Sequence, residues 1–266
     1  MLREALEYTI TPAPAWARRS GLLHDIIALQ ARYRRHKRAW RPHLDNTKSA
    51  IVSAVKTCRH TRTALILGSG ALYDIPLAPL CDRFERVVLV DAVHPWRARR
   101  IAMGRDGVEF IHHDLSGVYE GLLMGVANGA DTPPDPITAP LPGMAREDID
   151  LVVSANLMSQ LPLAPIEFMQ KHLTLSPDDE TKFARAILDA HLADIAGYDA
   201  AMCLITDRRR ETIGRDGEVL RASDALHDLE LPAPDHEWVW TIAPYGELSR
   251  DETVLNHVHS VITPQP

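Results

Sequence analysis

The chain has 266 residues, 45% of them apolar and 24% charged, with a formal net charge of −7. This length suits one large α/β domain with a small appendage, and no apolar run approaches the ~18–20 residues of a membrane span, which argues against a membrane protein. The N-terminus lacks the apolar core of a secretory signal, and the three cysteines are far apart and without metal-ligand spacing, so we expect a cytoplasmic protein.

The first 62 residues are predicted to form a helical extension. Ser20 is a plausible N-cap for a helix over about 21–40, and Pro42 is expected to end that helix. A second helix, over about 46–59, has apolar residues at helical spacing and leads into the main domain.

Charge is unevenly distributed along the chain. Residues 1–63 carry a net charge of +9, whereas the remainder carries −16. The basic residues include Arg34, Arg35 and Arg38, and aromatic residues are interleaved with them, which is typical of RNA or phosphate contacts. The same charges could form a solvated helix face or dock on the acidic body of the chain. We therefore keep open an RNA or acidic partner at these helices and an intramolecular contact.

Residues 63–266 are predicted to form the main domain, which opens on a glycine turn. The apolar run 64–67 indicates a buried strand, and Gly68-Ser69-Gly70 after it allows close approach of a ligand to the backbone. A helix is expected from Leu72 onward, and a second strand, 86–91, ends in a carboxylate. Strand, glycine turn, helix, strand and acid is the order of a nucleotide-binding βαβ unit. The acid, Asp91, is positioned to accept hydrogen bonds from both hydroxyls of a ribose.

A third strand is predicted over about 108–115. Its end contains His112, His113 and Asp114, but adjacent strand residues point to opposite faces, so we expect no metal site there. Asp114 alone, at the carboxyl end of a strand near the glycine turn, is placed to accept a hydrogen bond from the amino group of an adenine.

The segment 127–148 is rich in proline and is predicted to be an irregular surface excursion near the substrate mouth. A fourth strand, 150–156, follows it. Asn156 and Gln160 come where this strand ends, so they are candidates to meet the substrate or the reactive end of a cofactor. Helix capping is an equally good interpretation of Asn156.

The last third of the chain is predicted to hold one long helix and three strands. Ser176 is the expected N-cap of the helix, and His191 lies on its apolar side. A fifth strand, 201–206, is followed by a terminal and possibly antiparallel pair, 237–243 and 254–262.

Together these features resemble the class I S-adenosylmethionine-dependent methyltransferases over about residues 46–262. The resemblance rests on Leu67-Gly68-Ser69-Gly70 as the glycine motif, Asp91 as the ribose-binding acid, Asp114 beside the adenine, and 150–162 as the strand-four motif. It implies an α/β fold with a Rossmann-like, doubly wound, mostly parallel sheet, a C-terminal antiparallel strand and the helical segment in front.

The resemblance also implies S-adenosylmethionine as cofactor and methyl transfer to a small molecule or an RNA. The donor needs little from side chains, because the sulfonium is already activated and alignment supplies much of the rate. Acceptor-side groups to test are Glu247, Tyr245 and His191. The residues implied at the cofactor are Gly68, Ser69, Gly70, Asp74, Asp91, Ala92, Asp114, Leu115 and Asn156.

Two departures from the family pattern leave alternatives. Ile66 stands where the family usually has an acid, for which Asp74 is a substitute, and Leu72 stands where it has a third glycine. A non-catalytic binding or assembly protein that keeps the fold therefore remains open. A nicotinamide-dependent oxidoreductase is the other alternative, although Tyr73 replaces the third glycine of that fingerprint.

Overall fold

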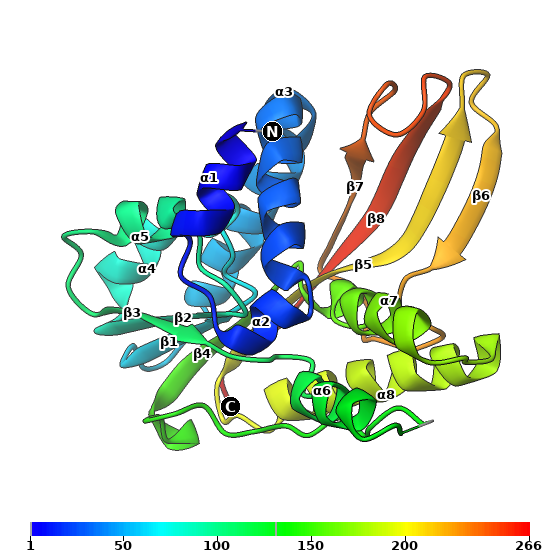
Figure 1. The fold of residues 1–266 in the computed structure, drawn as a ribbon. Helices are drawn as coiled ribbons and strands as arrows, with labels where there is room; N and C mark the ends of the chain where they lie inside the picture. Colours follow the sequence, from blue (N-terminus) through cyan, green and yellow to red (C-terminus); the bar gives the residue numbers. More distant parts are fainter. Residues whose placement is uncertain (1, 131) are drawn as a thin grey trace.

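The computed structural model describes residues 2–130 and 132–266, and these form a mixed eight-stranded sheet flanked by helices (Figure 1). The strand order is β3-β2-β1-β4-β5-β8-β7, and β6 pairs with the outer part of β5. The strands are β1 (Thr63–Leu67), β2 (Arg86–Asp91), β3 (Val108–His112), β4 (Ile149–Ala155), β5 (Ala201–Gly214), β6 (Val219–Asp224), β7 (His236–Ala243) and β8 (Glu252–Thr263). The α-helices are α1 (Leu2–Ile10), α2 (Ala15–Arg19), α3 (Leu22–Val55), α4 (Leu77–Arg83), α5 (Trp96–Ala102), α6 (Tyr119–Ala127), α7 (Leu163–His172) and α8 (Pro177–Ala196).

The parallel half of the sheet, β3-β2-β1-β4-β5, is apolar on both faces. Along β1, Ala64 and Ile66 pack into one core cluster and Leu65 and Leu67 into another, because successive side chains point to opposite faces. Such strands need cover on both sides, which the connecting helices provide. Because these strands are parallel, their carboxyl ends meet at one edge, and the glycine turn after β1 lies there. The predicted doubly wound sheet is confirmed.

The C-terminal strands complete the sheet with antiparallel pairing. β8 pairs antiparallel with both β5 and β7, as the alternating pattern of the last two strands predicts. The predicted end of β5 after Thr206 is wrong, because the strand continues to Gly214, and β6 was not predicted at all. Exposed polar residues such as Arg208 read as a strand end, yet an antiparallel ribbon can face water. Figure 1 shows this ribbon projecting beyond the parallel core.

The long helix α3 lies over the carboxyl edge of the sheet and packs on β7. The two predicted helices of this region are one kinked helix, so the predicted end at Pro42 is wrong. The backbone leaves helical angles at His36 (φ −115°, ψ 25°), and the helix resumes through the proline. A proline bends a helix without ending it when both halves are packed. Leu23 before the kink and Ile51 after it are both fully buried.

The helix after the glycine turn starts later than predicted. Leu72 has a left-handed φ of +56°, and Ile75 precedes Pro76, a position that disfavours helical angles. Helix α4 therefore begins at Leu77, five residues beyond the predicted start. The first residues after the glycine turn form a loop instead, and that loop brings Asp74 toward the sheet edge.

Two further predictions concern α8 and the proline-rich excursion. Oγ of Ser176 accepts a hydrogen bond from the Asp179 N–H over 3.2 Å, which confirms the N-cap of α8. The described part of 127–148 is irregular between α6 and a single 3₁₀ turn, as predicted, and Asp131 lies outside the described residues. None of the helices in the described parts of the chain has the length and apolarity that crossing a bilayer requires.

Candidate functional site

The turn after β1 is built on two glycines with left-handed backbone angles. Gly68 has φ +79°, and a Cβ placed there would lie 2.8 Å from Cβ of Leu157 and 3.0 Å from the carbonyl oxygen of Ala155. Gly70 has φ +45°, and its N–H donates to Oδ2 of Asp91 over 2.8 Å. An L side chain is strained at such angles, and Gly68 also has no room for one. The turn is thereby tied to the end of β2.

Ser69 and His94 support this turn from the interior. Oγ of Ser69 lies 2.9 Å from Nε2 of His94, and both side chains are buried. Burial lowers the pKa of His94 to about 3, so the ring is neutral at physiological pH. His94 therefore holds the middle residue of the turn rather than facing solvent.

Asp91 stands directly beside the turn, at the end of β2. Burial raises the pKa of its carboxyl group to about 6, although the backbone N–H groups of Gly70, Val93 and Ala92 favour the charged form. Asp74 adds a like charge that acts in the same direction as burial. The carboxylate is thus only partly satisfied by the backbone and borders the open space next to Gly70.

Asp114 lies two residues past β3, near the same edge. Its carboxylate accepts hydrogen bonds from the backbone N–H groups of Ser116 (3.0 Å) and Tyr119 (2.8 Å). These bonds fix the loop that carries Leu115 to the start of α6. The hydroxyl of Ser116 also donates to Oδ1 over 2.5 Å. Asp114 therefore has a structural role here, and it keeps about one lone pair for a further donor.

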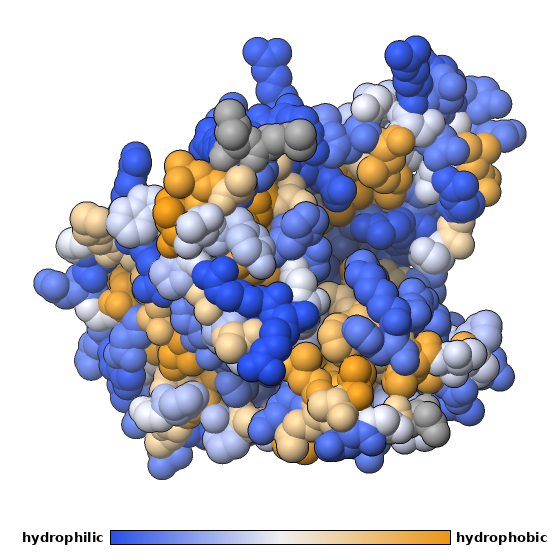
Figure 2. All heavy atoms as spheres, in the orientation of Figure 1, coloured by the Kyte–Doolittle hydropathy of each residue, from blue (hydrophilic) through white to orange (hydrophobic). Residues whose placement is uncertain are grey.

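One large cleft joins these residues. It has a volume of about 490 Å³ and lies between α3, the carboxyl edge of the sheet, the start of α7 and β7. Figure 2 shows the surface hollowed between α3, α7 and the projecting strands. All nine predicted cofactor residues line it: Gly68, Ser69, Gly70, Asp74, Asp91, Ala92, Asp114, Leu115 and Asn156.

Asp74 and Asn156 form a polar pair inside the cleft. Nδ2 of Asn156 donates to Oδ2 of Asp74 over 2.7 Å and to Oγ1 of Thr47 over 3.2 Å. Asn156 has a left-handed φ of +52°, which its short polar side chain tolerates. Burial raises the pKa of Asp74 above its usual value. Oδ1 of Asn156 is buried, and no group in 2–130 or 132–266 donates to it. The pair thus lacks one donor, which a ligand can supply.

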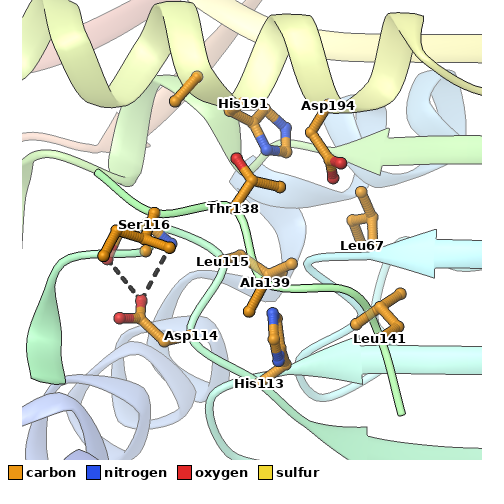
Figure 3. A pocket seen from close by; sticks show the side chains of 13 residues that line it. Leu67, His113, Asp114, Leu115, Ser116, Thr138, Ala139, Leu141, His191 and Asp194 are labelled. Atoms are coloured by element: carbon orange, nitrogen blue, oxygen red, sulfur yellow. Dashed lines mark hydrogen bonds between the residues drawn. The ribbon is translucent and has the colours of Figure 1, made fainter. Parts of the chain in front are cut away.

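The three predicted acceptor-side residues do not line this cleft. His191 is buried beneath the sheet, where its Nε2 lies 2.9 Å from Oγ of Ser154. Figure 3 shows it beside Asp194 at a separate pocket of about 20 Å³, room for about one water. The hydroxyl of Tyr245 donates to the carbonyl oxygen of Gly214, where the turn of the β5–β6 hairpin begins. Their prediction rested on their order in the chain, and chain order does not show which residues lie close together in the fold.

The excursion 127–148, which is predicted near the substrate mouth, borders the small pocket instead, and none of its described residues lines the large cleft. Ile137 of the excursion donates its N–H to the Gly117 carbonyl oxygen over 2.9 Å and lines that pocket with His113. His112 points elsewhere, toward the carbonyl oxygen of Ala92 and the guanidinium of Arg99. No group of three or more potential metal ligands comes together in the described residues.

Glu247 joins the β7–β8 loop to the kink of α3. Its carboxylate contacts Arg32 (3.2 Å), Arg35 (2.5 Å) and Nε2 of His36 (2.6 Å). The hydrogen bond from Arg35 holds the pKa of Glu247 at about 2, against the opposing effect of burial. A carboxylate of such low basicity is a poor proton acceptor. Its position indicates that it fastens the helix that covers the cleft.

We expect Glu247→Gln to lower the free energy of unfolding by about 1–2 kcal/mol at pH 7, since several partly exposed ion pairs are lost at once. The folded pKa of about 2 lies below the ordinary value of 4.5, so this contribution is present above about pH 4.5 and disappears as the pH falls toward 2. Urea unfolding at pH 7 and pH 3 measures it. The difference between the two proteins should shrink at pH 3, whereas Glu230→Gln, at an exposed glutamate, should change neither value. An equal difference at both pH values would contradict the ion-pair explanation.

The basic N-terminal helices make intramolecular contacts. Arg34 pairs with Glu4 and Glu7 of α1 at 3.1 Å, and Arg35 pairs with Glu247. Two of the arginines considered for an RNA contact are thus engaged by the chain's own carboxylates, while Arg38 is exposed. A contact with RNA or an acidic partner at these helices stays a prediction.

The sequence did not predict the end of the cleft that lies between α3 and β7, the far end from the glycine turn. Trp40 and His43 on α3 and Trp240 on β7 form an aromatic wall there. About 200 residues separate the two parts in the chain. One sequence signal could have indicated it. Trp238 and Trp240 alternate along β7, and two large aromatic side chains on one face of a strand need another element to pack against.

Comparisons with known proteins find solved structures of low sequence identity to this chain. No family model and no curated protein matches the chain. The 1,6-didemethyltoxoflavin-N1-methyltransferase of Burkholderia thailandensis, with 1,6-didemethyltoxoflavin and S-adenosylhomocysteine bound, is 13% identical over 94% of this chain and 92% of that one (TM-score 0.39). DhpI bound to S-adenosylhomocysteine is 16% identical over 91% and 95% (TM-score 0.36). A SAM-dependent methyltransferase of Leishmania major is 13% identical over 96% and 81% (TM-score 0.34). With identities and TM-scores this low, function has to be inferred from this chain's own residues.

Proposed function

We propose that the chain binds S-adenosylmethionine in the large cleft and transfers its methyl group to an acceptor bound beside it. The observation that carries this proposal is the meeting of the glycine turn and Asp91 in one cleft, joined by the Gly70 N–H. Ligands of open α/β sheets bind at the carboxyl ends of the strands, and an acid there suits a ribose. The cleft volume falls within the range of small-molecule sites.

The residues present fit an adenosine-type ligand. Next to Gly70, the nearest atom to an added Cβ would be Oδ2 of Asp91 at 3.7 Å, so the backbone there is open to a ribose. Asp114 is assigned to the amino group of the adenine. Ile66 is fully buried in the core and cannot reach a ligand. Asp74 lines the cleft six residues after Gly68, and we assign it to the amino-acid end of the cofactor in place of the missing acid.

When bound, the cofactor supplies an activated methyl group on sulfur. The chain's own task is then to orient the acceptor and to keep water out, and alignment of this kind can supply much of a rate enhancement. Helix α3 covers the cleft and supports that role. A general base is needed only for an acceptor that holds its proton tightly, so the distant positions of Tyr245 and His191 are compatible with methyl transfer.

Titration of the purified protein with S-adenosylhomocysteine and, separately, with NADH tests the proposal. We expect micromolar binding of S-adenosylhomocysteine in isothermal titration calorimetry and no binding of NADH, because Tyr73 replaces the third glycine of a dinucleotide fingerprint. Binding of NADH alone would favour the oxidoreductase alternative. Binding of neither would favour a non-catalytic protein that kept the fold and lost the donor site.

A further inference from the structure

The wall at the end of the cleft between α3 and β7 is aromatic. The rings of His43 and Trp240 are stacked, with centroids 4.0 Å apart and an interplanar angle of 6°, and Trp40 meets Trp240 edge-on at 5.0 Å. Nε1 of Trp40 donates to the carbonyl oxygen of Ile242, which fixes the helix against β7. Aromatic walls of this kind favour aromatic ligands through stacked and edge-to-face contacts.

His43 has a defined proton position. Nε1 of Trp238 donates to Nδ1 of His43 over 3.0 Å, and an indole N–H cannot accept, so the ring proton must be on Nε2. Burial lowers the pKa of His43 to about 3, which keeps the ring neutral. Nε2–H is therefore a fixed, uncharged donor on a residue that lines the cleft.

Asn156 provides the complementary group. Both N–H bonds of its amide are used, one on Asp74 and one on Thr47, and its Oδ1 is buried without a donor among the described residues. Leaving a buried acceptor unpaired costs about 1–3 kcal/mol, which a ligand N–H or O–H would recover. Nε1 of Trp240 is likewise buried and unpaired within the described chain.

Helix geometry places these groups on the same side of the cleft. His43 and Thr47 are four residues apart on α3, so they lie about one helical turn apart on one face. The hydroxyl of Thr47 accepts from Nδ2 of Asn156, and both His43 and Asn156 line the cleft, so the two residues border the same part of it. Asp74, a carboxylate of the cleft, is already bound to Asn156.

We propose that this end of the cleft is the acceptor subsite and takes an uncharged, planar heterocycle that carries both a hydrogen-bond acceptor and an N–H or O–H donor. The acceptor atom of the heterocycle meets Nε2–H of His43, and its donor meets Oδ1 of Asn156. The inference rests on the proposed function, because it assigns the acceptor class of the same cleft.

Three small probes test the inference in the full-length protein saturated with S-adenosylhomocysteine. 2-Quinolone is planar and carries an adjacent N–H and C=O, N-methyl-2-quinolone lacks the N–H, and octahydro-2-quinolone keeps the lactam but is not flat. Saturation-transfer NMR with titration should show 2-quinolone binding at least about fivefold tighter than either analogue, as the loss of one hydrogen bond implies. Equal binding of all three would overturn the inference.

Variants identify the donor. His43→Phe keeps the stacked ring and should weaken 2-quinolone about tenfold while leaving the affinity for S-adenosylhomocysteine unchanged. Trp238→Phe keeps His43 but frees its tautomer, so it should weaken 2-quinolone severalfold and serves if His43→Phe fails to fold. His172→Phe, at an exposed histidine of α7, is the matched control and should change nothing.

The two proposals fail in different ways. Normal binding of S-adenosylhomocysteine, with 2-quinolone affinity unchanged in folded His43→Phe and Trp238→Phe, would overturn the acceptor assignment and leave the proposed function standing. Binding of 2-quinolone through His43 in a protein that never binds S-adenosylhomocysteine would overturn the proposed function, and the wall would remain a heterocycle site.

Discussion

Asp91→Ala should weaken the binding of S-adenosylhomocysteine by about 30–150-fold. The carboxylate at the end of β2 is assigned two ribose hydroxyls, each hydrogen bond being worth roughly 1–1.5 kcal/mol, so about 2–3 kcal/mol is lost. The substitution also removes the acceptor of the Gly70 N–H and so loosens the glycine turn. Asp91→Asn separates the two effects, because its amide oxygen can still accept from Gly70 while its NH₂ group no longer accepts from a hydroxyl.

The pH dependence of the wild-type protein provides a second test of the same carboxylate. Burial raises the pKa of Asp91 to about 6, so the charged form, the better acceptor for hydroxyl groups, is lost as the pH falls through 6. We expect the affinity for S-adenosylhomocysteine to decrease below that pH in the wild type and to depend less on pH in Asp91→Asn, where Asp74 is the remaining cleft carboxylate with a raised pKa. Asp106→Ala, at an exposed carboxylate before β3, is the matched control. Unchanged affinity in a folded Asp91→Ala protein would mean that the ribose binds elsewhere.

The part of the cleft around the glycine turn could be predicted because its signals are local. The glycine turn and Asp91 come at the ends of apolar runs, and Asp114 follows the third strand by two residues. Parallel strands bring such ends to one edge whatever the rest of the chain does. The predicted N-cap of α8 is local in the same sense. Leu72 stands where the family pattern has its third glycine, and it has a left-handed φ of +56°, an angle that glycine adopts readily.

The end of the cleft between α3 and β7 could not be predicted because it depends on contacts between distant parts of the chain. Whether Pro42 ends or merely bends a helix depends on what both halves pack against. His43, directly after the proline, packs on Trp238 and Trp240 of β7, about 200 residues away. Glu247 is predicted as an acceptor-side residue. In the structure it forms ion pairs with Arg32 and His36 instead, and these hold α3 in place over the cleft. Chain order gives no measure of such distances.

Gly68→Ala should destabilise the fold by about 2–4 kcal/mol. The left-handed φ of +79° costs an L residue roughly 1–2 kcal/mol, and the new methyl group would overlap Cβ of Leu157 and crowd the carbonyl oxygen of Ala155. Ala155 is the last residue of β4 and is held in the sheet, and Leu157 follows it by two residues, so both have little freedom to move. Urea unfolding followed by circular dichroism measures the change.

Gly70→Ala is the matched variant two residues away, and it should behave differently. Its φ of +45° also strains an L residue, but an added Cβ would meet only Oδ2 of Asp91, at an ordinary contact distance of 3.7 Å. We therefore expect a loss of only about 1 kcal/mol in stability. The methyl group would, however, enter the space assigned to the ribose, so S-adenosylhomocysteine binding should fall more than stability does. If Gly68→Ala proved as stable as Gly70→Ala, the tight packing of the turn against β4 would be wrong. If Gly70→Ala bound S-adenosylhomocysteine normally, the cofactor could not lie against this backbone.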